Sequence, residues 1–150
     1  QHHMFSEWVF ENEERFRTVI GEGEQVSGEW LAQAHGTRYN LESEPFVVFD
    51  VFDETRTRYA WLDVLRKTEF ARFQVPFSVS YGPAMAIKEA MSLLGTYGKH
   101  GALDPIEGVV WRVENRNMFD FMVKYVRPNK IDGEYLPELN GGEEYWNWEG

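Results

Sequence analysis

The spacing of apolar positions predicts three helices along the chain of 150 residues. Residues 5–20 carry large apolar side chains at mostly helical spacing, which predicts one amphipathic helix with Ser6 as its N-cap. Residues 59–73 predict a second helix, which ends before the next proline. A third helix is expected to begin with Pro83 in its first position and to end at Gly95.

Other stretches have the composition and alternation of β-strands. Residues 25–32 alternate, and residues 45–53 form a nearly continuous apolar run interrupted by Asp50, a carboxylate that needs partners if it is buried. Residues 106–128 contain two runs rich in β-branched and aromatic residues around the polar segment 114–117, which predicts a β-hairpin. Because helices and strands alternate without a βαβ rhythm, we expect an α+β fold with antiparallel sheets and flanking helices.

Composition indicates one domain with enough apolar residues to form a core, since 43% of the residues are hydrophobic. Cysteine is absent, which excludes disulfides and thiolate metal sites, and no apolar run approaches the length of a membrane span. We therefore expect a cytoplasmic protein without membrane contact. Residues 1–4 look like the remnant of an affinity tag, residues 5–128 are assigned to the domain, and residues 129–150 to a polar tail packed on its surface.

The formal net charge of −10 argues against a nonspecific nucleic-acid-binding protein, which needs excess positive charge to displace counterions. The charge is uneven, because arginine and lysine gather in residues 56–72 and 112–130 while acidic residues dominate both ends. A local basic surface therefore remains compatible with the composition.

Glu107 and Lys124 are candidates for chemistry because they lie on opposite strands of the expected hairpin. A carboxylate and an ammonium group on paired strands could hold a metal ion and a phosphate between them. The alternative is a cross-strand ion pair on the surface, which the spacing alone favours.

Four segments in this order resemble the covalent nucleotidyltransferases, the superfamily of ATP-dependent RNA and DNA ligases and mRNA capping enzymes. They are Gly28-Glu29-Trp30, Phe49-Asp50-Val51, Glu107-Gly108-Val109-Val110 and Val123-Lys124-Tyr125. The RNA ligase branch is the most similar, because a GEW segment followed by a loop with tyrosine and a strand ending in FD is typical of it. The resemblance covers residues 8–128 and implies a nucleotidyltransferase fold like the adenylation domain of ligases.

The resemblance also implies a reaction and roles for individual residues. A lysine attacks the α-phosphate of ATP, AMP passes to a 5′-phosphate end, and a 3′-hydroxyl seals the strand. Glu29 would bind the ribose or a metal, Phe49 would stack on adenine, Glu107 would hold Mg²⁺, and Lys124 would neutralise the α-phosphate. The structural alternatives are a surface Glu29, a core Phe49, a turn-capping Glu107 and a snorkelling Lys124. Together, the side chains expected to converge on one cleft between antiparallel sheets are Glu29, Phe49, Glu107 and Lys124.

This sequence departs from the family pattern in two places. The last motif usually has a second lysine two residues after the first, but Val126 stands there, which leaves Arg127 as the nearest candidate for the nucleotide. The nucleophile motif, Lys-x-Asp-Gly, belongs before the GEW segment, yet no lysine precedes Lys67. The one literal match, residues 130–133, follows the last motif, and is either a permuted nucleophile or an ordinary turn.

The sequence thus predicts an RNA-ligase-like nucleotidyltransferase domain, a fragment or a short form, without the lysine nucleophile in its usual place. ATP or AMP, Mg²⁺ and the ends of RNA or DNA are the expected ligands. Two alternatives stay open: a non-catalytic module that binds nucleotides or RNA ends, and the partner of a split ligase.

Overall fold

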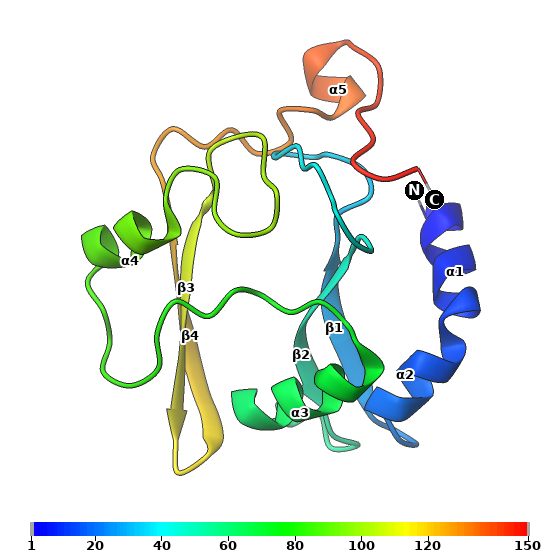
Figure 1. Ribbon diagram of the computed structural model, residues 1–150, viewed down its shortest axis with the longest axis vertical. Helices are drawn as coiled ribbons and strands as arrows, with labels where there is room; N and C mark the ends of the chain where they lie inside the picture. Colours follow the sequence, from blue (N-terminus) through cyan, green and yellow to red (C-terminus); the bar gives the residue numbers. More distant parts are fainter. Residues whose placement is uncertain (1, 150) are drawn as a thin grey trace. The chain divides into compact units, whose positions relative to one another are not determined.

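The computed structural model describes residues 2–149, so Gln1 of the expected tag remnant and Gly150 of the expected tail lie outside it (Figure 1). The chain divides into two compact units. The first comprises residues 1–30, 46–76 and 113–121, and the second comprises residues 31–45, 77–112 and 122–150. The elements in chain order are α1 (His2–Glu11), α2 (Glu13–Val19), β1 (Gln25–Trp30), β2 (Phe46–Phe52), α3 (Trp61–Ala71), α4 (Ile87–Leu94), β3 (Gly108–Asn115), β4 (Met118–Val126) and α5 (Pro137–Asn140).

Helices and small antiparallel sheets together make an α+β fold, as expected. The described strands form two sheets of two strands each, β1–β2 and β3–β4. No helix within residues 2–149 is long and apolar enough to cross a membrane.

In the first unit, β1 and β2 pair antiparallel with an irregular register. Ser27 pairs with Asp50 and Gly28 with Val48, which leaves Phe49 as the extra residue of a β-bulge. The bulge changes the faces on which the residues of β2 lie, so that Asp50 shares a face with Ser27 while Val48 shares the other with Gly28.

The aromatic core of the first unit covers the face of this sheet that carries Trp30 and Phe46. The rings of Phe5, Trp8, Phe16 and Phe73 lie within 4.7–6.3 Å of one another or of the two strand residues, measured between ring centroids. Gly28 is required here, because a Cβ atom at this position would lie 2.5 Å from the Phe46 ring. Aromatic packing therefore provides most of the large side chains that hold α1, α2 and the segment after α3 to the sheet.

The single helix expected for residues 5–20 is wrong: α1 and α2 are separate, with a break at Asn12. Asn12 donates from its side-chain amide to the Trp8 carbonyl at 2.8 Å, and its side-chain oxygen accepts from Arg15 at 2.7 Å. Local side-chain bonds of this kind compete with helix continuation. The helix also begins before Ser6, which lies inside α1 and is not an N-cap.

Helix α3 confirms the helix expected for residues 59–73. The backbone N–H of its first residue, Trp61, donates to the Glu114 side chain at 2.7 Å. At the other end Arg72 adopts the left-handed conformation, and Arg15 donates to the carbonyls of Ala71 and Arg72. Helix α3 contacts both α2 and β2 in the first unit.

The hairpin expected for residues 106–128 is confirmed by β3 and β4. Its connection is a turn of two residues, Arg116 and Asn117, which both have positive φ. Two-residue turns with two positive φ angles match the twist of antiparallel strands, and asparagine tolerates this conformation. The division between the units crosses the hairpin, with the turn in the first and the free ends of both strands in the second.

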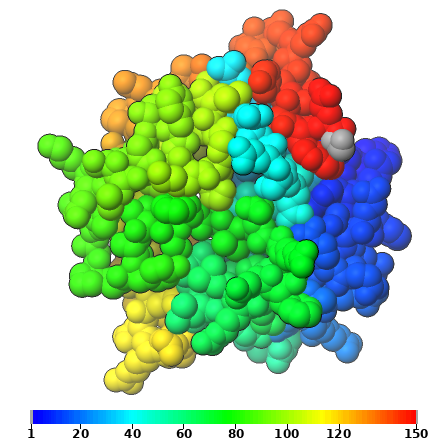
Figure 2. All heavy atoms as spheres, viewed as in Figure 1, coloured from blue at the N-terminus to red at the C-terminus, as the bar shows by residue number. Residues whose placement is uncertain are grey.

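The third expected helix is present but begins later than predicted. Helix α4 starts at Ile87, so Pro83 lies outside it, whereas Gly95 ends it with a φ of 72° as expected. In the second unit the tail is tied to residues 31–39 by backbone bonds, such as Ala34 N–H to the Tyr145 carbonyl at 2.8 Å. Figure 2 shows the last residues, in red, lying directly beside this segment, in cyan.

Candidate functional site

Glu107 and Lys124 form an ion pair at the open end of the hairpin. Glu107 immediately precedes β3, Lys124 lies late in β4, and the Lys124 Nζ and Glu107 Oε1 atoms are 2.6 Å apart. The Lys124 side chain is 57% exposed and that of Glu107 43%, so water screens the pair and its own contribution to stability is at most about 1 kcal/mol. The pair is therefore accessible to a ligand and weak enough to rearrange around one.

The backbone around Glu107 is held more firmly than its side chain. Gly108 lies so close to the opposite strand that a Cβ atom would overlap the Tyr125 carbonyl oxygen. Arg127 donates from its backbone N–H to the Glu107 carbonyl at 2.9 Å and from Nε to the Ile106 carbonyl at 3.0 Å. These contacts fix the position of the Glu107 backbone, from which its side chain extends.

Phe49 is the bulged residue of β2 and stands 36% exposed, while its strand neighbours Val48 and Asp50 are buried. None of the ring contacts among the described residues involves Phe49, in contrast to Phe46. Bulges commonly redirect a side chain away from the regular pleat. Phe49 is therefore partly exposed and lies outside the aromatic core.

Glu29 is exposed on β1, opposite Val47 in the register of the sheet. Glu29 and Phe49 thus belong to adjoining strands of the first unit, whereas the Glu107–Lys124 pair and Arg127 belong to the second. The structure brings Glu107 into contact with Lys124 and Arg127. Glu29 and Phe49 share only the β1–β2 sheet. Convergence of both groups on one cleft stays a prediction.

The buried Asp50 carboxylate forms an ion pair with Arg58, whose side chain is 34% exposed. Asp50 is 1% exposed, and its Oδ2 atom lies 3.0 Å from Arg58 Nε. The guanidinium carbon of Arg58 lies 5.1 Å from the ring centroid of Phe52 and 4.7 Å from that of Phe119. From the sequence, the position of Asp50 within an apolar strand indicated that the carboxylate needs a partner. The sequence signal for Arg58 as that partner is that it is a cation shortly after the turn that follows the strand.

Comparison with known proteins finds a match to the family model described as RNA ligase over residues 1–126. The chain belongs to the RNA ligase family. Searches among curated proteins and among solved structures find no match. Membership rests on most of the chain, including all four segments that carry the resemblance.

Within this RNA ligase family member, Lys130 of the Lys-x-Asp-Gly match is engaged in the second unit. Its ammonium group donates to the Gly36 carbonyl and, at 2.9 Å, to the Thr37 hydroxyl. The following Gly133 has a φ of 70°, which is ordinary turn geometry for an Asp-Gly pair. Lys130 therefore joins the tail to residues 36–37.

No group of three or more histidine, aspartate or glutamate side chains within residues 2–149 is arranged to hold a metal ion. Mg²⁺ usually takes one or two protein carboxylates and completes its shell with water and substrate phosphates. Glu107, with its exposed carboxylate beside a lysine, fits that pattern as a single protein ligand.

Two other charge clusters have shifted pKa values and serve the fold. In the first unit, the Tyr59 hydroxyl donates to Glu24, which also pairs with Lys67 at 2.9 Å; these bonds lower the pKa of Glu24 to about 2 and raise that of Tyr59 to about 12. In the second, Arg38 holds Asp104 by a two-pronged bond and lowers its pKa to about 2.

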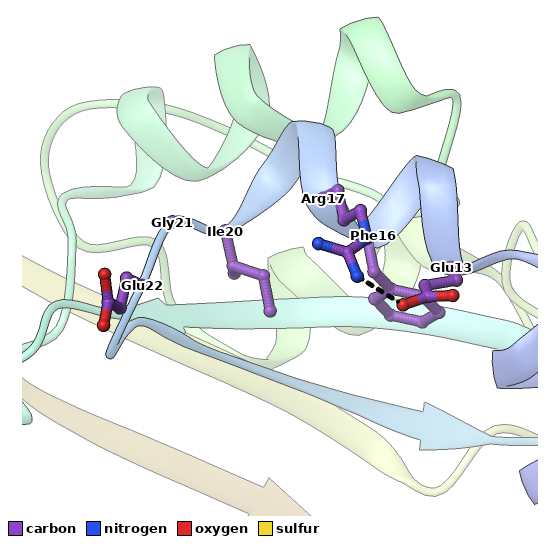
Figure 3. Close-up of a pocket in the computed structure, with 6 residues that line it drawn as sticks. All are labelled: Glu13, Phe16, Arg17, Ile20, Gly21 and Glu22. Carbon is purple, nitrogen blue, oxygen red and sulfur yellow. Dashed lines mark hydrogen bonds and ion pairs between the residues drawn. The ribbon is translucent and has the colours of Figure 1, made fainter.

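A surface hollow of the first unit lies along α2 and its end (Figure 3). Its lining combines the apolar Phe16 and Ile20 with the ion pair of Glu13 and Arg17, 2.6 Å apart. None of the residues expected from the sequence lines it. The candidate residues lie elsewhere: Glu107, Lys124 and Arg127 at the end of the hairpin in the second unit, and Glu29 and Phe49 on the β1–β2 sheet of the first.

Proposed function

We propose that this chain binds ATP as part of an RNA-ligase nucleotidyltransferase domain, with the Glu107–Lys124 pair as the phosphate and Mg²⁺ site. The observation that carries the proposal is this exposed ion pair at the end of the β3–β4 hairpin, in a chain that belongs to the RNA ligase family. A carboxylate and an ammonium group 2.6 Å apart can separate around a magnesium–phosphate group, each then facing the opposite charge.

Each residue has a distinct role in the proposed complex. Lys124 would neutralise the α-phosphate as a point charge, and Glu107 would supply one carboxylate oxygen to Mg²⁺. When bound, Mg²⁺ would screen the negative charge of the phosphates. In the first unit, the family resemblance implies stacking on adenine for Phe49 and a contact with the ribose or the metal for Glu29.

The family reaction would place the ends of RNA or DNA beside this nucleotide. A ligase forms a lysine–AMP intermediate, and among the 150 residues no lysine stands ahead of Gly28. The second candidate function, left open by the sequence, is a nucleotide- or RNA-end-binding module without catalysis. Both functions require the same ATP site.

The test is calorimetric titration of the chain with ATP, with and without Mg²⁺. We expect Lys124→Gln to weaken binding in both conditions by roughly 10- to 150-fold, the value of a charge-assisted bond of about 1.5–3 kcal/mol. Glu107→Gln should abolish only the part of the affinity that Mg²⁺ adds. Asp120→Asn removes another exposed carboxylate from β4 and is the matched control. Absence of ATP binding by the unaltered chain, or equal affinity in all variants, would refute the proposal.

A further inference from the structure

Three consecutive carbonyl groups lead up to the Glu107 side chain, and one arginine satisfies all of them. Arg127 donates from its backbone N–H to the Glu107 carbonyl at 2.9 Å, from Nε to Ile106 at 3.0 Å and from Nη2 to Pro105 at 3.3 Å. The planar guanidinium fork is suited to such a multiple contact, whereas a lysine ammonium is not pre-organised for it.

The same segment is held from its other side. The Ile106 N–H donates to the Thr96 carbonyl at 2.8 Å, so Ile106 is bonded through both its backbone groups. Gly108 then allows the backbone to approach Tyr125 more closely than any residue with a Cβ atom would. The backbone of residues 105–108, which includes Glu107, is therefore fixed by hydrogen bonds and close packing. Arg127 donates most of these hydrogen bonds.

The Glu107–Lys124 ion pair cannot provide this rigidity by itself, because both side chains are about half exposed. A carboxylate that serves as the single protein ligand of Mg²⁺ must nevertheless start from a defined position, since octahedral Mg²⁺ tolerates little distortion. The backbone contacts of Arg127 meet that requirement without any contact to a ligand.

We infer that Arg127 is a positioning residue for Glu107 and acts on Mg²⁺ through that carboxylate, rather than binding the nucleotide itself. The Nε and Nη2 groups of Arg127 donate to the backbone carbonyls of Ile106 and Pro105, so these two donors are not available to a nucleotide. The inference rests on the proposed ATP–Mg²⁺ site. It replaces the role in nucleotide binding that the resemblance suggested for this position.

The experiment measures ATP affinity by calorimetry with and without Mg²⁺ for Arg127→Gln, Arg127→Lys, Glu107→Gln and the double variant Arg127→Gln/Glu107→Gln. We expect Arg127→Gln to keep the Mg²⁺-free affinity and to lose about 10- to 100-fold of Mg²⁺ affinity, the usual effect of removing a residue that orients a metal ligand. Arg127→Lys should retain part of the increase in ATP affinity that Mg²⁺ causes. Arg116→Gln, in the exposed turn of the same hairpin, should retain all of that increase.

The double variant decides between the roles, because two residues that act through one contact are not additive. We expect it to equal Glu107→Gln alone. Equal weakening by Arg127→Gln with and without Mg²⁺ would show a direct contact with the nucleotide and overturn the inference, as would full retention of the Mg²⁺ effect. If Glu107→Gln itself keeps that effect, the proposed function fails at Glu107 and the inference fails with it. Melting temperatures of all variants identify unfolding, in which case Arg127→Lys alone supplies the comparison.

Discussion

Replacing Phe49 with leucine should separate ligand binding from folding. The ring is 36% exposed at a bulge and makes no ring contact within residues 2–149, so its removal should change the free energy of unfolding little. Stacking of a base on an aromatic ring contributes about 1–3 kcal/mol. We therefore expect Phe49→Leu to raise the dissociation constant for ATP by roughly 5- to 150-fold.

Phe46, three residues earlier on the same strand, is the matched control. It is 5% exposed and its ring centroid lies 5.6–6.2 Å from those of Phe5, Trp8, Phe16 and Phe73. Each aromatic pair is worth about 0.5–1.5 kcal/mol beyond its buried area, so Phe46→Leu should cost roughly 2 kcal/mol or more. For a protein of this length that lowers the melting temperature by about 4–8 °C.

Thermal unfolding followed by circular dichroism and ATP titration by calorimetry give the two readouts. The expected pattern is loss of affinity without loss of melting temperature in Phe49→Leu, and the reverse order of effects in Phe46→Leu. If Phe49→Leu melts as early as Phe46→Leu and binds ATP like the unaltered chain, Phe49 is a core residue and the stacking role is wrong.

Two further predictions concern stability. Gly108→Ala should lower the melting temperature strongly, because its Cβ atom would overlap the Tyr125 carbonyl, whereas Gly21→Ala, with its nearest neighbouring atom 3.8 Å away, should have little effect in the same scan. The lowered pKa of Glu24, about 2, means that its stabilising bonds are complete above the ordinary carboxyl pKa and are lost as pH falls from there toward 2. Unfolding measured from pH 7 to pH 2 should therefore show a shallower acid loss in Glu24→Gln, and identical pH slopes would contradict the role of the Tyr59 bond.

The hairpin was predictable because local signals agree: two runs of strand-forming residues flank a polar turn in which Asn117 tolerates a positive φ. The break at Asn12 was not, since it depends on side-chain bonds to Trp8 and Arg15 that apolar spacing does not encode. The late start of α4 has a similar origin: Pro83 is compatible with a first helical turn but does not impose one.

The candidate site shows the same division between local and distant information. The ordered segments around Glu29, Phe49, Glu107 and Lys124 indicated the family, and a short ion pair between Glu107 and Lys124 was one of the two arrangements expected. The contacts of Arg127 could not be predicted, because its partners are backbone carbonyls about twenty residues away in the sequence. A sequence specifies which side chain each residue has, but every residue has a backbone carbonyl. A hydrogen bond to a backbone carbonyl therefore has no sequence signature.

Lys130 should not form a covalent adenylate, although it begins the only Lys-x-Asp-Gly match in the sequence. The adenylylating step requires a neutral amine that attacks the α-phosphate in line with the departing pyrophosphate, forming the Lys–AMP bond as the P–O bond breaks. The Lys130 ammonium instead donates to the Gly36 carbonyl and the Thr37 hydroxyl, contacts that tie it to residues 36–37 of the second unit. Incubation with Mg²⁺ and α-labelled ATP, followed by denaturation, should leave the protein unlabelled, and Lys130→Ala should behave identically, with Lys99→Ala as the control for a lysine elsewhere in the second unit.

Label retained by the unaltered chain and lost only in Lys130→Ala would establish a permuted nucleophile. Label that appears only when a segment bearing Lys-x-Asp-Gly is supplied in trans would instead identify the chain as the nucleotide-binding part of a ligase whose nucleophile lies elsewhere.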